Sequence, residues 1–224
     1  MRTALIAAAA ILLACTKQPA VAAAARADTS KPVTTCDSLA CADRGRIQGN
    51  QNAKVWLVMA SDFECPYCKM FHDDAYKQVV ENYVKPGLVR VAFLNHPGSM
   101  HRHAQIAAEA AMCAAMQDKF WAMHDSLFSQ QEHWAALDAP LPVFDQLATG
   151  MGVEMNDWRV CMQTHKTLPL IDSDNIRTTK AGVNGTPMFF VADKLAIQGV
   201  APYSQFKLVL DSALAKAGTP SPSP

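Results

Sequence analysis

The amino-acid sequence predicts an α/β fold that is interrupted by an all-helical insertion. Short runs rich in valine and aromatic residues are typical of buried strands, and they occur towards both ends of the chain, at 54–61, 88–94, 188–192 and 195–198. Between these runs, residues 101–178 are dominated by strong helix formers with wide apolar faces. The 224 residues are enough to bury the core of one such domain together with its insertion.

The first strand is joined to the helix after it by the motif Cys-Pro-Tyr-Cys at 65–68. Pro66 suits the first turn of a helix, because the N–H group that it lacks would have no partner there. The helix is expected to have one apolar face, since apolar residues recur at every fourth position, at Phe71, Ala75, Val79 and Tyr83. Cys65 is therefore expected at the N-terminus of this helix.

The second half of the chain is predicted to contain further helices and then a hairpin. Helices are expected at 141–161 and 170–180. Asp193-Lys194 is expected to form the turn between the last two strands. Pro202 then begins a final amphipathic helix that runs to about residue 217.

The N-terminus predicts export. An unbroken apolar run from Ala4 to Ala14 follows a positive start; it is too short to span a bilayer but has the length of a signal-peptide core. The run ends in Leu-Leu-Ala-Cys at 12–15, which resembles a bacterial lipobox. Residues 1–15 are therefore predicted to be a lipoprotein signal that ends at the lipid-carrying Cys15. Cleavage after the alanine run at 22–25 is the alternative.

Composition constrains the regions on either side of the domain. Residues 16–46 are rich in Ala, Thr, Pro and Lys without periodicity and are predicted to be a flexible tether, and residues 219–224 a disordered tail. The residue after the lipid cysteine is Thr16 and not an aspartate, which favours sorting of the lipoprotein to the outer membrane. The 20 basic and 20 acidic residues balance, so no nucleic-acid partner is expected.

The seven cysteines require an explanation, because an odd number leaves one thiol without a partner in an exported protein. Assigning Cys15 to a lipid leaves six cysteines, which an oxidising compartment allows to pair. Cys36 and Cys41 are close enough to close a small ring, but six cysteines allow many pairings. The six are Cys36, Cys41, Cys65, Cys68, Cys113 and Cys161.

No metal site and no cofactor are predicted. A cysteine zinc site needs a second CxxC or a suitably spaced histidine pair, and the sequence contains a single CxxC. His72 is expected to be a surface or packing residue. His96, His101 and His103 fit a loop and a helix start, and the methionines fit the core.

The CxxC motif indicates redox chemistry because of its place between a strand and a helix. Free N–H groups and the positive end of the helix dipole stabilise a thiolate at Cys65. A lowered pKa increases the reactive fraction and makes the thiolate a better leaving group. A strand, a CxxC and a helix in this order are the context of a thioredoxin-like redox site. An inert disulfide or half of a metal site is the alternative.

Three segments resemble the DsbA-like family of thiol–disulfide oxidoreductases, and they occur in that family's order. SDFECPYC at 61–68 resembles the active-site segment. MQDKFWAMHDSLF at 116–128 resembles the first long helix of the inserted subdomain, and VNGTPMFFV at 183–191 resembles the segment that carries a cis-proline. The resemblance covers roughly residues 47–215 in one continuous order.

The resemblance implies a thioredoxin-like fold with an all-helical insertion. Residues 47–100 and 179–218 would form the thioredoxin-like domain, and residues 101–178 would form the inserted helical subdomain. Cys113 and Cys161 lie within that insertion and are similar to a structural disulfide found in some family members.

The same resemblance assigns the active-site roles. Cys65 would be the nucleophile that forms a mixed disulfide, and Cys68 would be the resolving thiol. Pro187 would be cis and would face Cys65, which exposes backbone groups for an extended substrate. Thr186 would offer its hydroxyl to the sulfur. The residues expected to shape the site and its redox poise are Pro66, Tyr67, Thr186 and Pro187.

One position departs from the family pattern. Family members often carry a buried glutamate six residues before the first cysteine, and this chain has Met59 there. Asp62 or Glu64 is a candidate to replace that acid. Glu64 adjoins Cys65, however, and a close negative charge would oppose formation of the thiolate. The strength of the chain as an oxidant is therefore open.

The function predicted is that of an exported enzyme that exchanges its Cys65–Cys68 disulfide with substrate proteins, most of all as a disulfide-forming oxidase. Its partners would be unfolded or partly folded exported proteins with cysteines and a membrane redox protein that resets the site. It would be a periplasmic monomer held by its lipid, or a soluble periplasmic protein. The alternatives are an isomerase or reductase of the same fold, or a Cu(I)-binding thioredoxin-fold lipoprotein.

Overall fold

The structure is a computed structural model and describes residues 38–218. Several predictions fall outside these residues and stay predictions. They concern the signal at 1–15 with Cys15, the first part of the tether at 16–37 with Cys36, and the tail at 219–224.

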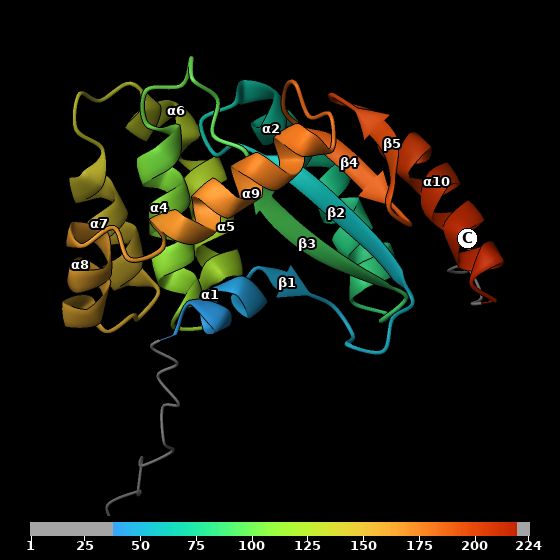
Figure 1. Cartoon of the computed structure of the whole chain (residues 1–224), viewed down its shortest axis with the longest axis horizontal. Helices are drawn as coiled ribbons and strands as arrows, with labels where there is room; N and C mark the ends of the chain where they lie inside the picture. Colours follow the sequence, from blue (N-terminus) through green and yellow to red (C-terminus); the bar gives the residue numbers. More distant parts are fainter. Residues whose placement is uncertain (1–37, 219–224) are drawn as a thin grey trace, which may run out of the picture. The chain divides into compact units, whose positions relative to one another are not determined.

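A five-stranded mixed sheet forms the centre of the fold, in the order β1-β3-β2-β4-β5 (Figure 1). The central strand β2 pairs in parallel with β3, with Val55 opposite Val89, and antiparallel with β4, with Leu57 opposite Val191. The short β1 is antiparallel to β3, and β5 is antiparallel to β4. The strands are β1 Ile47–Gln48, β2 Val55–Ser61, β3 Val89–Asn95, β4 Met188–Val191 and β5 Lys194–Gln198.

One continuous helix connects β2 to β3. It consists of α2 Pro66–Phe71, η1 His72–Tyr76, α3 Lys77–Val79 and η2 Val80–Val84, where η denotes π-helical turns. The apolar face predicted from the four-residue spacing is confirmed, because all four of its residues are buried. An α-helix has 3.6 residues per turn, so a strict spacing of four drifts around it. The wider π-helical turns reduce that drift and keep the face on the sheet.

The all-helical insertion lies beside one end of the sheet (Figure 1). The single helix predicted at 141–161 is two helices, since Gly152 breaks it with a φ of 73°. Trp134, Phe144 and Trp158 are fully buried here and fill the space between the helices. The helices are α4 Ala104–Ala115, α5 Phe120–Ser129, α6 Gln131–Ala135, α7 Leu141–Gly150 and α8 Met155–Gln163.

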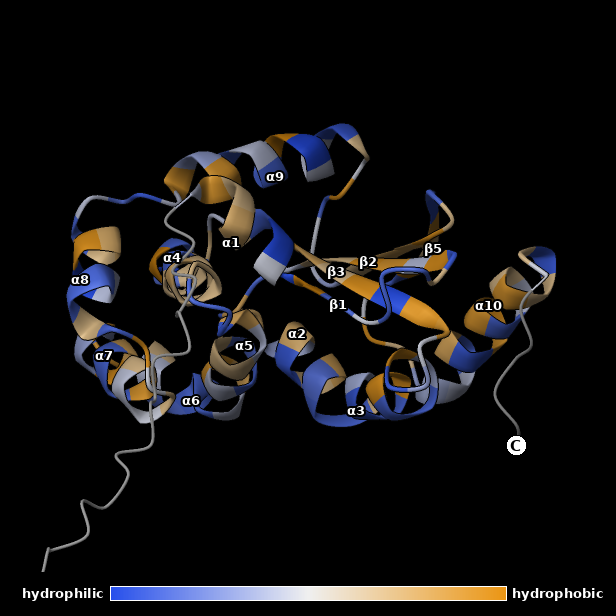
Figure 2. Ribbon diagram, turned by 90° about the horizontal axis from the view of Figure 1, so that it is seen from below, coloured by the Kyte–Doolittle hydropathy of each residue, from blue (hydrophilic) through white to orange (hydrophobic). Residues whose placement is uncertain are grey.

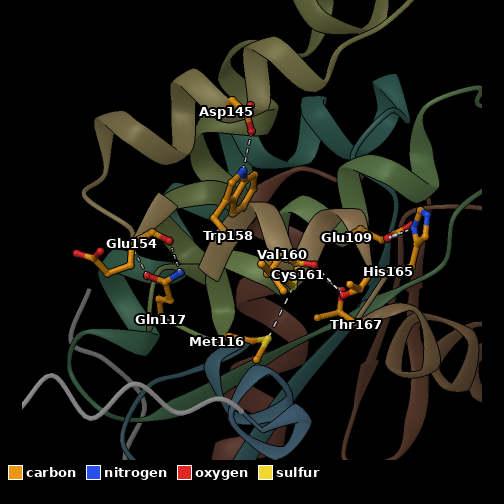
Figure 3. Close-up of a disulfide and its surroundings, with 12 residues drawn as sticks. Glu109, Met116, Gln117, Asp145, Glu154, Trp158, Val160, Cys161, His165 and Thr167 are labelled. Atoms are coloured by element: carbon orange, nitrogen blue, oxygen red, sulfur yellow. Dashed lines mark hydrogen bonds and ion pairs between the residues drawn. A yellow bond between two sulfur atoms is a disulfide. The ribbon is translucent and has the colours of Figure 1, made fainter. Parts of the chain in front are cut away.

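A disulfide joins Cys113 on α4 to Cys161 on α8, and thus two helices of the insertion (Figure 3). On the same helix as Cys161, the Trp158 indole N–H donates to Asp145 of α7 at 2.7 Å. Close to the disulfide, the ring of His165 lies 2.7 Å from a carboxylate oxygen of the buried Glu109 on α4. These contacts connect α4, α7 and α8 independently of the sheet.

Helices cover both faces of the sheet (Figure 2). Helix α9, Leu168–Lys180, packs on β3 on the same side as α1. Helix α10, Tyr203–Lys216, packs on β2 and β4 on the opposite side, next to η1 and α3. The boundary predicted at residue 178 falls inside α9, which therefore leads from the insertion back to the sheet. Among residues 38–218, no helix has the length and apolar character needed to cross a membrane.

The tether predicted to extend to residue 46 is wrong over its last part, because Leu39–Gly45 forms the helix α1. Its Ala42 is fully buried and α1 contacts α4. The adjoining Arg46 is 3% exposed and forms ion pairs with Asp43 and with the buried Asp174 of α9. A buried arginine needs such partners, and Asp174 lies too far along the chain for a local pattern to reveal it.

The hairpin between β4 and β5 turns one residue earlier than predicted. Ala192 and Asp193 carry positive φ angles of 50° and 60°, while Lys194 already belongs to β5. Two central residues with positive φ match the right-handed twist of the strands, as in a type I′ turn.

Candidate active site

The end of β2 and the start of α2 place Cys65 at the sheet edge. β2 ends at Ser61, and the next residues form a tight turn that is held by Asp62. The side chain of Asp62 accepts the N–H of Glu64 at 2.8 Å, and its backbone carbonyl accepts the N–H of Cys65 at 3.2 Å. Cys65 is thereby the N-cap of α2, with Pro66 in the first turn as expected.

Both thiols of the motif are free, and they occupy different depths. Cys65 Sγ lies 3.4 Å from the backbone carbonyl oxygen of Thr186, and the Thr186–Pro187 bond is cis. Cys65 lines a groove of about 730 Å³, whereas Cys68 is fully buried beneath it. The groove is also lined by Pro66, Tyr67, Met100, His101, Asn184 and Thr186.

The pKa of Cys65 is lowered from 9.0 to about 6. The largest cause is a hydrogen bond from the thiol of Cys68 to the Cys65 sulfur, and burial opposes it. The side chain of Thr186 and the backbone N–H groups of Cys68 and Tyr67 add further donors. These are the N–H groups that a helix N-terminus leaves without a partner, so the first turn of α2 stabilises the thiolate.

The pKa of Cys68 is raised well above its ordinary value. Burial is the largest cause, and the hydrogen bond and negative charge of Cys65 add to it, while Ser61 and a backbone group of Asp62 oppose it weakly. The two cysteines are therefore inequivalent. Cys65 is the thiolate at neutral pH, and Cys68 remains a protonated thiol that donates to it.

Asp62 and Glu64, the candidates to replace the acid missing at the buried Met59, hold a loop beside the site. Asp62 Oδ2 accepts the N–H of Gly98 at 2.7 Å and lies 2.7 Å from His101 Nδ1. Glu64 accepts the N–H of His103. Both carboxylates thus fix the segment at 96–103, whose residues 96–101 form one wall of the groove.

Gly98 fits this arrangement because a side chain would crowd the ion pair. A Cβ atom at this position would lie 3.2 Å from His101 Nδ1 and 3.3 Å from Asp62 Oδ2. The hydrogen bond and charge of Asp62, together with the charges of Cys65 and Glu64, outweigh partial burial and raise the pKa of His101. A positive charge is therefore favoured at the wall of the groove, close to the thiolate.

Gln131 connects the insertion to the active-site turn and has no counterpart in the sequence-based prediction. It is 4% exposed on α6, and its side-chain amide donates to the carbonyl of Phe63 at 2.6 Å and to that of Cys65 at 3.0 Å. A glutamine in a helical pattern carries no local signal for this role. Its burial, known only from the fold, is what identifies it.

The other cysteines among residues 38–218 do not line the groove. Cys113 and Cys161 are joined within the insertion, and Cys41 on α1 is in a disulfide. Its predicted partner Cys36 and the lipidation candidate Cys15 are outside the described residues. The structure thus brings together Cys65, Cys68, Pro66, Tyr67, Thr186 and Pro187 at one site.

Comparison with known proteins identifies the family. Residues 42–212 match the profile of the family described as Thioredoxin. The chain is 24% identical over 174 residues to the disulfide bond formation protein D of Bacillus subtilis, with 75% of this chain and 76% of that protein covered. It is 32% identical over 150 residues to the Na(+)/H(+) antiporter NhaA 3 of Salinispora tropica, but covers 22% of that protein's length and 66% of its own.

The solved structures agree on the fold. The oxidised BdbD structure from Bacillus subtilis superimposes with a TM-score of 0.69 at 23% identity, covering 77% of this chain and 94% of BdbD. The α-DsbA1 structure from Wolbachia pipientis gives a TM-score of 0.67 at 21% identity, covering 77% and 92%. The predicted fold class, a thioredoxin-like fold with an all-helical insertion, is confirmed. The chain therefore belongs to the thioredoxin family, as a DsbA-like member of its thiol–disulfide oxidoreductases.

Proposed function

We propose that this chain is an exported oxidase that donates the Cys65–Cys68 disulfide to cysteine-containing substrate proteins. The observation that carries the proposal is the inequality of the two thiols at the start of α2. A substrate thiolate attacks the Cys65 sulfur, which lines the groove, and the Cys68 sulfur leaves with the electron pair of the broken bond. A second substrate thiolate then attacks the substrate sulfur of the mixed disulfide, and Cys65 leaves as a thiolate. The substrate is oxidised and the CxxC pair is reduced.

The low pKa of Cys65 favours the oxidase direction. At pH 7 a thiol with a pKa of about 6 is roughly nine-tenths ionised, whereas one at 9.0 is ionised to roughly one part in a hundred. This difference stabilises the dithiol form by about 1.4 kcal/mol and raises the reduction potential by about 30 mV. A stabilised dithiol makes the disulfide a stronger oxidant.

The groove beside Cys65 supports an extended polypeptide as the substrate. Tyr67 and Met100 expose large apolar side chains at its rim, with 59% and 91% of their surface accessible. The carbonyl of Thr186, next to the cis-proline, lies beside the sulfur that a substrate would attack. Apolar rim contacts and backbone pairing bind unfolded chains with little regard to sequence.

The reduction potential of the Cys65–Cys68 pair tests the direction. The purified protein is equilibrated with glutathione buffers, and the dithiol fraction is measured by alkylation. We expect a potential well above about −270 mV, the value for thioredoxin. A potential at or below that value would instead support a reductase supplied with electrons across the membrane. Stoichiometric Cu(I) binding by the reduced protein without disulfide exchange would support the copper-binding alternative.

We further propose that the chain acts in the periplasm, held by a lipid on Cys15 and reset by a membrane redox protein. The apolar run before Cys15 and the lipobox-like residues support this location. Cys15→Ser tests the anchor. We expect the wild-type chain in the membrane fraction, labelled by a fatty-acid probe, and the variant without label. Equal labelling of both would overturn the anchor without affecting the redox proposal.

A further inference from the structure

A cluster of potential metal ligands lies behind the active-site helix, away from the groove. Within residues 38–218, His72, His124 and Asp125 place three potential ligand atoms within 4.8 Å of one another. His72 is the first residue of η1, directly after α2, while His124 and Asp125 belong to α5 of the insertion. Figures 1 and 2 both show α5 next to this helix.

Asp125 lies between the two imidazoles. Its Oδ1 is 3.2 Å from His72 Nε2 and 2.8 Å from His124 Nδ1. A tetrahedral ion with bonds of about 2.0–2.2 Å holds its ligand atoms about 3.3–3.6 Å apart, so these side chains would need to move by only about half an ångström to admit it. His72 and His124 are 6% and 2% exposed, so protein packing holds both rings, and the side chain of Asp125 is 58% exposed.

Both ring nitrogens of His72 face carboxylate oxygens. Its Nδ1 lies 3.0 Å from an Asp73 carboxylate oxygen, and its Nε2 faces Asp125. A neutral imidazole has one N–H, so one of its nitrogens would present a lone pair to a carboxylate. A metal ion bound to that nitrogen removes the repulsion. With a metal on Nε2, the Nδ1–H donates to Asp73, which is the carboxylate–histidine–metal arrangement of many metal sites.

We propose that His72, His124 and Asp125 bind a divalent transition-metal ion of the imidazole-preferring kind, such as Zn²⁺. Two imidazole nitrogens and one carboxylate oxygen are a common ligand set for zinc with an open fourth position. Mg²⁺ and Ca²⁺ prefer oxygen ligands and fit this set poorly. A hollow of about 520 Å³ lined by His72, Tyr76, Trp121 and Asp125 gives the ion access to the site and leaves room for a water molecule as the fourth ligand.

The bound ion would link the active-site helix to the insertion. No bond is made or broken in the CxxC motif, and no electron is transferred. Zinc would thereby tie η1 to α5, next to the helix that presents Cys65.

The test uses the full-length protein in its oxidised form, because the Cys65–Cys68 disulfide then cannot supply thiolates to the metal. Zn²⁺ binding is measured by equilibrium dialysis and by the change in Tm. We expect about one equivalent to bind, with about tenfold or greater loss of affinity in His72→Gln and in Asp125→Ala. His133→Gln, at an exposed histidine on α6, is the matched control and is expected to bind like the wild type.

Asp73→Asn is a second test variant that is expected to fold like the wild type, because it removes no metal ligand and alters an exposed carboxylate. We expect it to weaken Zn²⁺ binding by about tenfold through the orientation of His72. A ¹⁵N spectrum of the imidazoles gives a second readout, in which zinc shifts His72 Nε2 and leaves Nδ1 protonated. Absence of stoichiometric binding, or equal binding by the wild type, His72→Gln and Asp125→Ala, would overturn the proposal.

Discussion

Nearby hydrogen bonds stabilise the Cys65 thiolate, and His101, whose pKa is raised, lies at the wall of its groove. Cys65 contributes to the raised pKa of His101. Charge interactions are reciprocal, so a protonated His101 stabilises the thiolate in return. The side chain of His101 is 24% exposed, and solvent therefore weakens this coupling without abolishing it.

We expect His101→Gln to raise the pKa of Cys65 and to slow its alkylation at pH 6 by about twofold, because fewer molecules carry the thiolate. Absorbance of the thiolate at 240 nm and the alkylation rate, both followed against pH, provide the measurement. His133→Gln changes a distant exposed histidine and serves as the control. An unchanged titration of Cys65 in His101→Gln would show that His101 only shapes the loop.

At the scale of residues, the sequence was sufficient wherever the chemistry is local. Cys65, Cys68 and Pro66 occupy a strand-to-helix junction that can be read from the order of residues alone. The partners of Asp62 could not be predicted, because Gly98 and His101 reach it only after the loop folds over the sheet edge. The place of a buried acid is taken by Met59, and nothing in the structure explains that substitution.

At the scale of elements, helix α6 supports the active-site turn through a single side chain. Gln131 satisfies the carbonyls of Phe63 and Cys65, which are buried with it. We expect Gln131→Met to lower the free energy of unfolding by about 1–3 kcal/mol, because two buried acceptors lose their donor. Urea denaturation measures this loss. Gln130→Met, at the exposed neighbour, is the matched control, and equal stability of the two variants would contradict the role of Gln131.

The disulfide between α4 and α8 has a different purpose from the CxxC pair. It joins two cysteines that are 48 positions apart in the sequence, so it restricts the conformations of the unfolded chain. We expect the double variant Cys113→Ala, Cys161→Ala to lose about 2–4 kcal/mol of stability and to keep the reduction potential of Cys65–Cys68. Denaturation and glutathione equilibration test the two parts separately. A changed potential would show that the insertion transmits its packing to the redox site.

The elements themselves were predicted more fully than their ends. Strands and helices with a regular apolar pattern appear where the pattern predicts them, as with β2 and the helix that follows it. Helix α1 was missed because its seven residues carry little apolar signal, and the buried pair of Arg46 and Asp174 stabilises it from another part of the chain. Short helices of this kind depend on tertiary contacts rather than on propensity.

At the scale of the whole molecule, the low pKa of Cys65 links folding stability to redox state. A group whose pKa is lower in the folded state than in the unfolded state stabilises the fold. Its full contribution is present above the unfolded-state pKa and is lost as the pH falls through the folded-state pKa. For Cys65 the window runs from pH 9.0 down to about 6. Only the dithiol form has this contribution, since the disulfide does not titrate. Reduction should therefore stabilise the protein more at high pH than at low pH.

We expect the stability of the reduced protein, relative to the oxidised protein, to increase by about 2 kcal/mol between pH 6 and pH 8, which corresponds to about 4–8 °C in the difference of Tm. The difference between the two forms is the quantity to measure, because groups such as the buried His124, with a pKa of about 4, affect both forms alike and cancel. Calorimetry of the two forms at several pH values gives this difference.

Cys65→Ser removes the thiolate. Its Tm is expected not to show the additional rise with pH that the reduced wild-type protein shows. A Tm difference that stays constant from pH 6 to pH 8 would mean that Cys65 titrates near 9.0, and the argument for a strong oxidant would then lose its physical basis.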